Sequence, residues 1–290
     1  MGVLEELTTQ EPPEELFHYT TLTGLEGIIQ SKKFWTTKIQ LLNDSSEFSF
    51  TLNRMQELIN TKIAEFPEQK DKLESLRNDI NCIYKANIFV GSLSTAFDSL
   101  SQWRSYGNDE GSILIGFRGS RLKELAEQQN FFLTKCEYKE DEQEKIIQDL
   151  FEEARIGNLE TIYDTLKKEK SKGSVVYNCK EGNEFWKKMA ILAPIIKHPS
   201  FIAEQEWRLF SAYPADMRDI DLHLNKANSY YIPHIDIELG NDLKDIITRI
   251  VIGPHRNMEV MYYSLGAFLS KNDIDSTTIL DTTKTTYRII

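Results

Sequence analysis

The segment from Leu16 to Ile29 joins a short strand directly to a helix, and the rest of the chain must fold around this unit. Leu16 to Thr20 follows two prolines and contains apolar, aromatic and β-branched residues, which predicts a strand. Apolar residues then recur at helical spacing at Leu22, Leu25, Ile28 and Ile29. Thr23 and Glu26 have the spacing of a capping box. His18 is therefore expected on a strand just before a helix N-terminus, where folds often hold a ligand.

Short strand patterns alternate with helical patterns along the chain. Strands are predicted at 34–37, 87–94, 112–117, 131–138, 230–237 and 246–252, and 201–210 passes from a helical end into a strand. Helices are predicted at 48–84, divided by Pro67, and at 98–106, 121–129, 185–197 and 258–269. The segment 246–252 is almost continuously apolar, which predicts a central strand, and 276–290 is strand-like. This order predicts an α+β or α/β fold in which helices flank one mixed sheet of short strands.

A single domain over residues 1–290 is expected, because no internal repeat or low-complexity linker divides the chain. The segment 141–172 is acidic and then basic with helical periodicity, so we expect a helical insertion or a lid against the core. Residues 1–15 read as a polar lead-in.

Composition excludes several classes of protein. The formal charge of −11 argues against a nucleic-acid scaffold, which usually carries a basic stripe. Three cysteines lie far apart without a CxxC pair, so neither a zinc ribbon nor a disulfide framework is indicated. No apolar run has the length of a membrane span, and the N-terminus lacks the regions of a signal peptide. We therefore expect a cytoplasmic protein without membrane contact.

The common catalytic motifs are absent. The chain has no GxGxxG, no phosphate-binding loop of the P-loop type and no HExxH. The five histidines form no close pair at metal-ligand spacing, so no metal is expected. Three polar segments remain as candidates for chemistry.

The first candidate segment is His18-Tyr19-Thr20. A neutral imidazole offers one donor and one acceptor, which suits ribose hydroxyls. The alternative is a half-buried histidine whose hydrogen bonds are made by the backbone.

The second candidate segment joins Ser92 and Ser94 to a following helix. In a strand the two serines share one face, and paired hydroxyls can orient a sugar or a carboxylate. Trp103 and Tyr106 are suited to stacking on a flat ring, and Arg104 to holding a phosphate. The alternative is a serine-rich strand end followed by an aromatic core anchor.

The third candidate segment ends in Glu204, Glu206 and Arg208. If the chain is extended from Glu204, these three side chains point one way and Trp207 and Leu209 point into the core. One carboxylate can then stabilise an oxocarbenium ion while the other positions a nucleophile. The alternative is an ordinary exposed charged face.

Several motifs in order resemble a bacterial family catalogued as domain of unknown function 2971. They are Leu16–Ile29, the Leu-x-Asn-Asp motif that ends in Leu42-Asn43-Asp44, Ser92-x-Ser94 before Asp98 to Gly107, Lys197 to Arg208, Ile252-Gly253-Pro254 and Tyr287-Arg288. This resemblance covers nearly the whole chain, and the family name implies no function.

A strand ending in His-x-Thr before a helix is similar to the opening of ADP-ribosyltransferase-like domains. That resemblance implies NAD as substrate: His18 and Thr20 would hold the adenosine-side ribose, and Tyr19 or Tyr106 would cover the nicotinamide. It also places Ser92 or Ser94 near the nicotinamide and Glu206, or Glu204, at the reacting ribose. The glycine usual after the first helix is replaced here by Ser31-Lys32-Lys33. The acceptor would be a protein side chain, a nucleic-acid group or water.

Three alternative functions follow from the same segments. The pocket could sense a nucleotide without cleaving it, in a bacterial defence or stress system. The charged segment 141–172 could instead dock a protein partner. A nuclease or hydrolase could place Glu204, Glu206 and Asp44 around a metal, and loss of activity with a chelator would indicate it.

Overall fold

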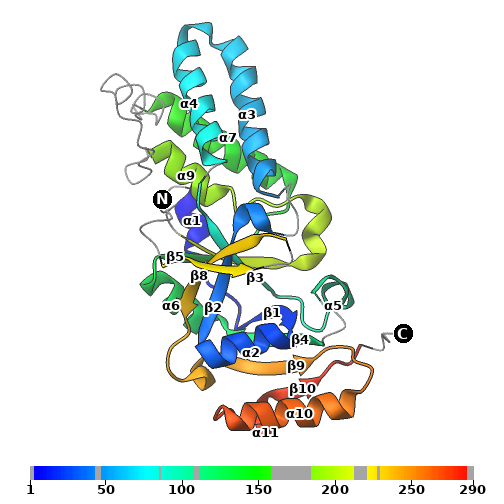
Figure 1. The fold of residues 1–290 in the computed structure, drawn as a ribbon. Coiled ribbons are helices and arrows are strands. Elements are labelled where there is room, and N and C mark those ends of the chain that lie inside the picture. The colour runs from blue at the N-terminus through cyan, green and yellow to red at the C-terminus, as the bar shows by residue number, and fades with distance from the viewer. Residues whose placement is uncertain are drawn as a thin grey trace.

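The computed structural model describes residues 3–42, 47–84, 86–106, 111–157, 184–211, 221–226 and 229–285. The molecule is elongated, with a bundle of helices at one end, a strongly twisted sheet in the middle and further helices at the opposite end (Figure 1). No helix within these ranges combines the length and the apolar character needed to cross a membrane.

The sheet is built almost entirely from antiparallel pairs. Its main path runs β10-β9-β4-β1-β3-β2-β8-β7, with β6 paired to β3 and β5 paired to β6. Only the pair of β10 with β9 is parallel among the strands described. The strands are β1 (Glu15–Thr21), β2 (Lys33–Lys38), β3 (Phe89–Ser94), β4 (Ser112–Arg118), β5 (Phe131–Lys135), β6 (Glu206–Ser211), β7 (His223–Lys226), β8 (Tyr231–Glu238), β9 (Ile247–Ile252) and β10 (Leu280–Thr282). The expected mixed sheet with flanking helices is therefore confirmed.

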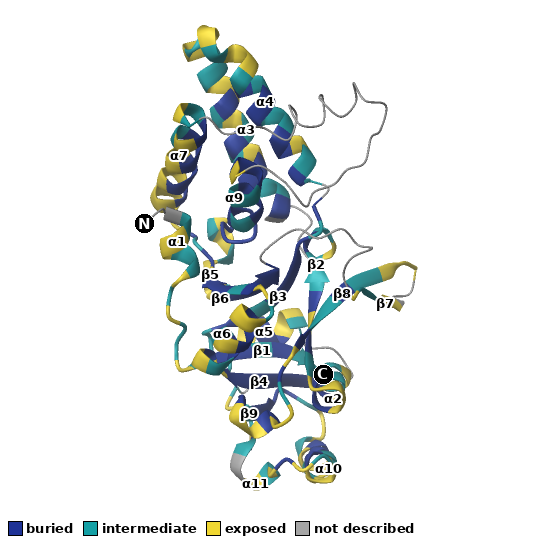
Figure 2. Cartoon of the chain, turned by 90° about the vertical axis from the view of Figure 1, so that its left-hand side faces the viewer, coloured by how far each residue is buried: buried dark blue, intermediate teal, exposed yellow. Residues whose placement is uncertain are grey.

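The helices form two groups. One group holds α1 (Val3–Thr8), α3 (Glu47–Glu65), α4 (Lys70–Ile83), α7 (Glu140–Ile156) and α9 (Glu184–Leu192). The other elements pack along the sheet: α2 (Leu22–Ser31), α5 (Leu100–Tyr106), α6 (Gly119–Gln128), α10 (Met258–Lys271) and α11 (Ser276–Ile279). Figure 2 shows that the buried sides of both groups face inward.

Two main hydrophobic cores correspond to these groups. One lies between the sheet and α2, α6 and α10, with Leu25, Leu122 and Leu265 among its buried residues. The other joins α3, α4, α7 and α9 to β3 and β6 through Val90 and Phe210. Helix α7 belongs to this second core, so the first half of the segment 141–172 packs within the helical bundle, while residues 158–172 lie outside the described residues.

The sheet divides at β3. One end of β3 pairs with β2 through Val90 and Thr37, whereas its other end pairs with β1 through Ser94 and Phe17. Strand β6 pairs along one side of β3, so β1 and β2 share the other side. Between Val90 and Ser94 these two strands diverge from each other. We call this opening, centred on Ser92, the fork.

A buried aromatic ring keeps the fork open from one face. A Cβ atom built on Gly91 would lie 2.3 Å from Cε1 of Phe34, so only glycine leaves room for that ring. Phe34 in turn contacts the His18 ring edge-on, with centroids 4.8 Å apart. The fork therefore depends on one small residue in β3 and two rings from the neighbouring strands.

Several local predictions are corrected by the structure. Helix α2 is capped by Thr21, whose hydroxyl accepts from the Gly24 amide at 3.1 Å, and not by Thr23. Residues 276–279 form a helical turn before β10, and α9 ends at Leu192 ahead of Pro194. Strand β9 is buried but lies second from an edge of the sheet, because β10 is short and terminal.

Candidate functional site

A pocket with a volume of about 290 Å³ lies at the fork. It is lined by strand residues from β1, β2, β3 and β6 and by the side of α5. The structure brings into it the predicted residues His18, Tyr19, Thr20, Ser92, Ser94, Tyr106, Glu204 and Glu206. Trp103 and Arg104 do not line this pocket.

Glu206 forms the buried floor of a charge network. The register places Glu206 opposite Ser94 and Arg208 opposite Ser92. Arg208 donates from Nε to Oε1 of Glu206 at 2.9 Å and from Nη2 to Oε2 at 3.0 Å, and Lys197 Nζ lies 2.6 Å from Oε2. Both Glu206 and Arg208 are buried, so the alternative interpretation of this segment as an exposed charged face does not hold for these two residues.

The ion pairs determine the protonation state of Glu206. Burial acts to raise the pKa of this carboxyl, but the charges of Arg208 and Lys197 and their hydrogen bonds outweigh it and lower the pKa to about 2. The carboxylate is therefore ionised throughout the neutral pH range.

Glu204 reaches the same lysine from a different backbone conformation. It ends a 3-10 helix over Pro199–Glu204, and Gln205 follows in the left-handed region with φ of 46°. The prediction of an extended chain from Glu204 is therefore wrong, because the strand begins at Glu206. The turn still places Oε2 of Glu204 2.5 Å from Nζ of Lys197. Thr95 holds Gln205 in place with a 2.8 Å hydrogen bond to its side-chain oxygen.

The two serines of β3 differ in what their hydroxyls contact. Ser94 Oγ donates to the Glu204 carbonyl at 2.5 Å and accepts from the Ala96 amide at 2.9 Å. Its hydroxyl is thus used to join β3 to the loop before β6. Within the described residues, the Ser92 hydroxyl makes no hydrogen bond to protein and lines the pocket.

His18 occupies the fork itself. Its Nδ1 lies 3.0 Å from the carbonyl of Ser92, a residue that pairs with Arg208 of β6 but with neither β1 nor β2. Because a carbonyl accepts, Nδ1 carries the proton, and in the neutral ring Nε2 is the acceptor. Burial lowers the pKa of His18, so the neutral form is favoured. His18 thus has features of both interpretations made from the sequence, because it has a backbone hydrogen-bond partner and also lines the pocket.

Tyr19, Trp103 and Asp98 fix the loop that precedes α5. Tyr19 donates its hydroxyl to the Ala96 carbonyl at 2.6 Å and accepts from the Ser99 amide at 2.9 Å. Trp103 is buried edge-on against Tyr19 and donates to Asp98 at 2.7 Å. Burial raises the pKa of Tyr19 to about 12. Trp103 is therefore an aromatic anchor in the core, as the alternative interpretation of this segment predicted, while the Arg104 side chain is exposed.

Sequence reasoning missed Lys197 and Trp35. Lys197 stands at the end of an apolar segment and shows no periodicity that would separate it from a surface lysine, yet it is 3% exposed between two glutamates. The strand pattern around Trp35 predicts only a place in the sheet, although Trp35 lines the pocket. Asp44, named in the metal-hydrolase alternative, lies outside the described residues. Within the described ranges no group of three or more acidic, histidine or cysteine side chains is arranged to hold a metal.

The arrangement as a whole combines two carboxylates, a neutral imidazole, a hydroxyl and aromatic rings in one pocket. Such a set can bind a sugar with an attached planar ring and can stabilise positive charge on the sugar. No curated protein and no solved structure matches the chain in comparison. A family model described as protein of unknown function (DUF2971) matches residues 102–209, which run from α5 to β6 and contain Glu204, Glu206 and Lys197.

Proposed function

We propose that the pocket binds NAD and cleaves its nicotinamide–ribose bond, transferring ADP-ribose to an acceptor or to water. The observation that carries this proposal is the meeting of His18, Ser92 and the Glu204–Glu206 pair in one pocket at the fork. The same residue types in the same chain order are similar to those of ADP-ribosyltransferase-like domains. No solved structure matches the chain, so this similarity is an analogy, and the residues of the pocket support the proposal.

Glu206 is suited to stabilise the charge that develops on the ribose as nicotinamide leaves. Arg208 and Lys197 fix the carboxylate before any ligand arrives, so little reorganisation is needed during the reaction. A carboxylate oxygen can accept more than one hydrogen bond. Among the described residues Oε1 accepts only from Arg208 Nε, which leaves acceptor capacity for a ribose hydroxyl.

The remaining groups suit the two parts of the ligand. The neutral pyridine-like Nε2 of His18 and the Ser92 hydroxyl suit ribose hydroxyls. Tyr106 lies at the pocket wall on α5 and is suited to covering the nicotinamide, in preference to Tyr19, whose hydroxyl holds the loop at Ala96. Glu204, 25% exposed in its side chain, is suited to align the acceptor.

The direct test is release of nicotinamide from labelled NAD, with a screen for label on added protein, nucleic acid or water. Glu204→Gln and Ser92→Ala are expected to lower the rate of release by roughly 10-fold or more, as loss of one positioned group typically does. The matched control is Glu57→Gln, since Glu57 is an exposed carboxylate on α3. Absence of both NAD binding and nicotinamide release at millimolar NAD would refute the proposal.

A second function, binding of a nucleotide without cleavage, is favoured by the satisfied state of the site. Ser94 is used by the backbone, and Glu206 is already paired with two cations, so the network is stable without a reacting ligand. Calorimetry would then show saturable binding of NAD or ADP-ribose while no nicotinamide appears. Such a protein would act as a sensor.

A further inference from the structure

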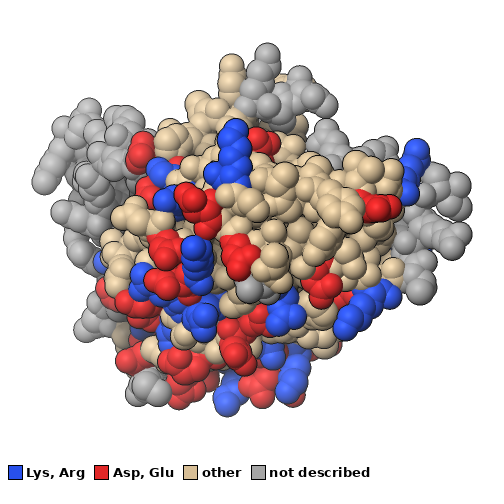
Figure 3. Space-filling view, turned by 90° about the horizontal axis from the view of Figure 1, so that it is seen from below, with Lys and Arg blue, Asp and Glu red and all other residues tan. Residues whose placement is uncertain are grey.

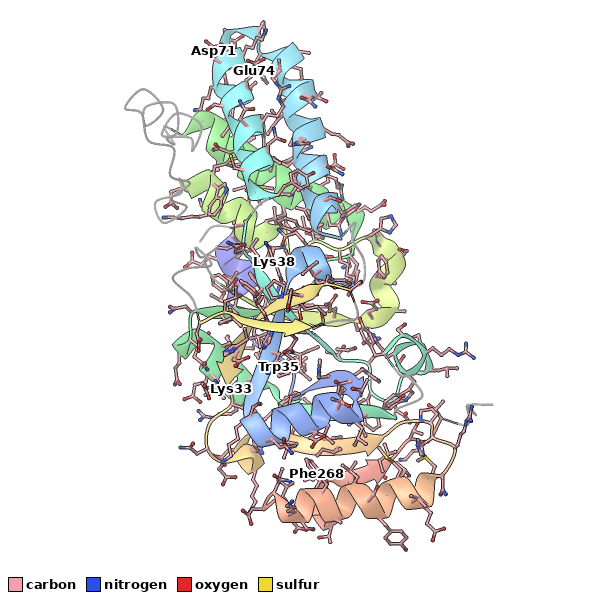
Figure 4. All side chains as sticks on the ribbon, viewed as in Figure 1. Lys33, Trp35, Lys38, Asp71, Glu74 and Phe268 are labelled. Carbon is pink, nitrogen blue, oxygen red and sulfur yellow. The ribbon has the colours of Figure 1, made fainter. Side chains whose placement is uncertain are left out.

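Trp35 presents an exposed indole at the rim of the pocket. Trp35 is 46% exposed, whereas Trp103, Trp186 and Trp207 are each 5% exposed or less. Figure 4 shows Trp35 in the middle of β2, between Lys33 and Lys38 at the two ends of the strand. A large aromatic side chain left open beside a pocket is a common way to receive a planar ring.

The indole of Trp35 is held in its orientation by the residues that pack against one of its faces. Its ring lies over the imidazole of His234, with centroids 4.6 Å apart and planes inclined by 31°. His234 is 4% exposed and stacks in turn on His223, with centroids 5.3 Å apart. Gly27 of α2 faces one indole edge, where a Cβ atom would come within 4.0 Å of Cζ2 of Trp35. The indole therefore forms a built platform with one covered face.

The charges around this platform favour a neutral ring over a phosphate. The nearest cation on the same strand face is Lys33, which lies 3.0 Å from Glu238 and 3.4 Å from Asp236. Its charge is thus balanced by two carboxylates, and a phosphate placed there would meet their repulsion. An uncharged base stacks on an indole without such a cost.

The topology separates this platform from the glutamates. Strand β3 lies between β2, which carries Trp35, and β6, which carries Glu206. The two sites therefore stand on opposite sides of Ser92, and a cavity of about 290 Å³ does not need to enclose both rings of a dinucleotide. One ring can lie beside the carboxylates while the other lies on the rim.

We propose that Trp35 is the stacking platform for the adenine base of the dinucleotide, while the cationic nicotinamide end lies beside Glu204 and Glu206. This assignment rests on the proposed NAD site and adds which half of the ligand goes where. It makes Trp35 a specificity-determining residue that selects a dinucleotide over a mononucleotide of nicotinamide.

The test uses the full chain, whose one open tryptophan is a natural probe. Acrylamide quenching of tryptophan fluorescence is measured with and without AMP, NAD or nicotinamide mononucleotide. AMP and NAD are expected to protect Trp35 from acrylamide, and nicotinamide mononucleotide is expected not to. Trp35→Leu is expected to raise the Kd of NAD and of AMP by roughly 10-fold, the value of one lost base–aromatic stack, and to leave that of nicotinamide mononucleotide unchanged.

Tyr263→Leu is the matched control, because Tyr263 is an aromatic residue on α10 that is 68% exposed and does not line the pocket. Circular dichroism confirms that each variant is folded. The assignment is overturned if AMP gives no protection, or if Trp35→Leu weakens NAD and nicotinamide mononucleotide equally. NAD bound on Trp35 without nicotinamide release would refute the proposed cleavage alone, whereas release unaffected by Trp35→Leu would refute this assignment alone.

Discussion

At the scale of single residues, Glu206 depends on its two cations and they depend on it. Lys197 is 3% exposed and Arg208 is 1% exposed, so removing the charge between them leaves two buried cations with one carboxylate fewer. Glu206→Gln is therefore expected to reduce the free energy of unfolding by about 3–5 kcal/mol. Urea denaturation of Glu206→Gln and of Glu204→Gln measures the change in the free energy of unfolding. Glu204→Gln is expected to reduce it less, because Glu204 is partly exposed. Equal stability of Glu206→Gln and the parent would contradict the network.

The same carboxyl sets the acid limit of the fold. Its pKa is about 2 in the folded chain and 4.5 as a reference value, so its contribution is fully present above pH 4.5. As pH falls from 4.5 towards 2, the unfolded carboxyl takes up a proton first, and about 3 kcal/mol of stability is lost. Urea unfolding at pH 5 and at pH 3 should show a large difference in the parent and a smaller one in Glu206→Gln. A parallel loss in both proteins would assign the acid limit to other groups.

At the scale of elements, the fork depends on the contact between β3 and β2. Gly91→Ala places a methyl group against the ring of Phe34, and overpacking of this kind costs about 1–3 kcal/mol. The double variant Gly91→Ala/Phe34→Leu is expected to recover part of that loss relative to the sum of the single variants. Unfolding in urea of all four proteins closes the cycle, and strict additivity would mean that the two residues are independent.

The loop before α5 is held by the last described residues of the chain. Asp98, with φ of 51°, accepts from Trp103, from the Thr283 hydroxyl and from the Lys284 amide at 2.8 Å. Asp98→Ala removes these acceptors and strains the left-handed backbone, whereas Asp98→Asn keeps an acceptor and the tolerance for that conformation. We expect faster amide hydrogen exchange in α5 for Asp98→Ala and a smaller change for Asp98→Asn. Unchanged exchange in both variants would show that the tail does not hold α5.

At the scale of the whole molecule, the helical core contributes to stability but lies mostly away from the pocket. Leu76 of α4 is fully buried in the helical core, away from the pocket lining. Leu76→Ala is expected to lower the free energy of unfolding by about 2–5 kcal/mol through a cavity. The Kd of a pocket ligand measured on the folded variant should stay within about 2-fold of the parent, since contacts at the fork are unchanged. A large loss of affinity would reveal coupling between the two cores.

Acidic and basic side chains are mixed on the face of the molecule that carries α10 (Figure 3). Seen from the side of α10, basic and acidic side chains are interspersed over part of the face, and the rest carries neither (Figure 3). Basic groups do not gather there into a stripe of the kind that binds nucleic-acid backbones. A nucleic-acid acceptor would therefore have to be recognised elsewhere on the molecule.

The sequence by itself determined the order of strands and helices, because apolar periodicity is a local property of the chain. It also placed His18, the two serines and Glu206 on strands, whereas Glu204 ends a 3-10 helix. The family resemblance was confirmed over residues 102–209. Local patterns were weakest at element ends, as the cap at Thr21 shows, because caps depend on side-chain contacts that neighbouring hydroxyls compete for.

Only the tertiary structure decided which of these side chains share a pocket and which are used by the fold. Ser94 meets the Glu204 carbonyl across 110 residues of sequence, and His18 meets the Ser92 carbonyl across 74. Such pairs follow from strand register and from the separation of β1 and β2, neither of which leaves a periodic trace in the sequence. The charge state of Glu206 depends in the same way on Lys197 and Arg208 being brought to it in a buried site, where ion pairs outweigh the cost of desolvation.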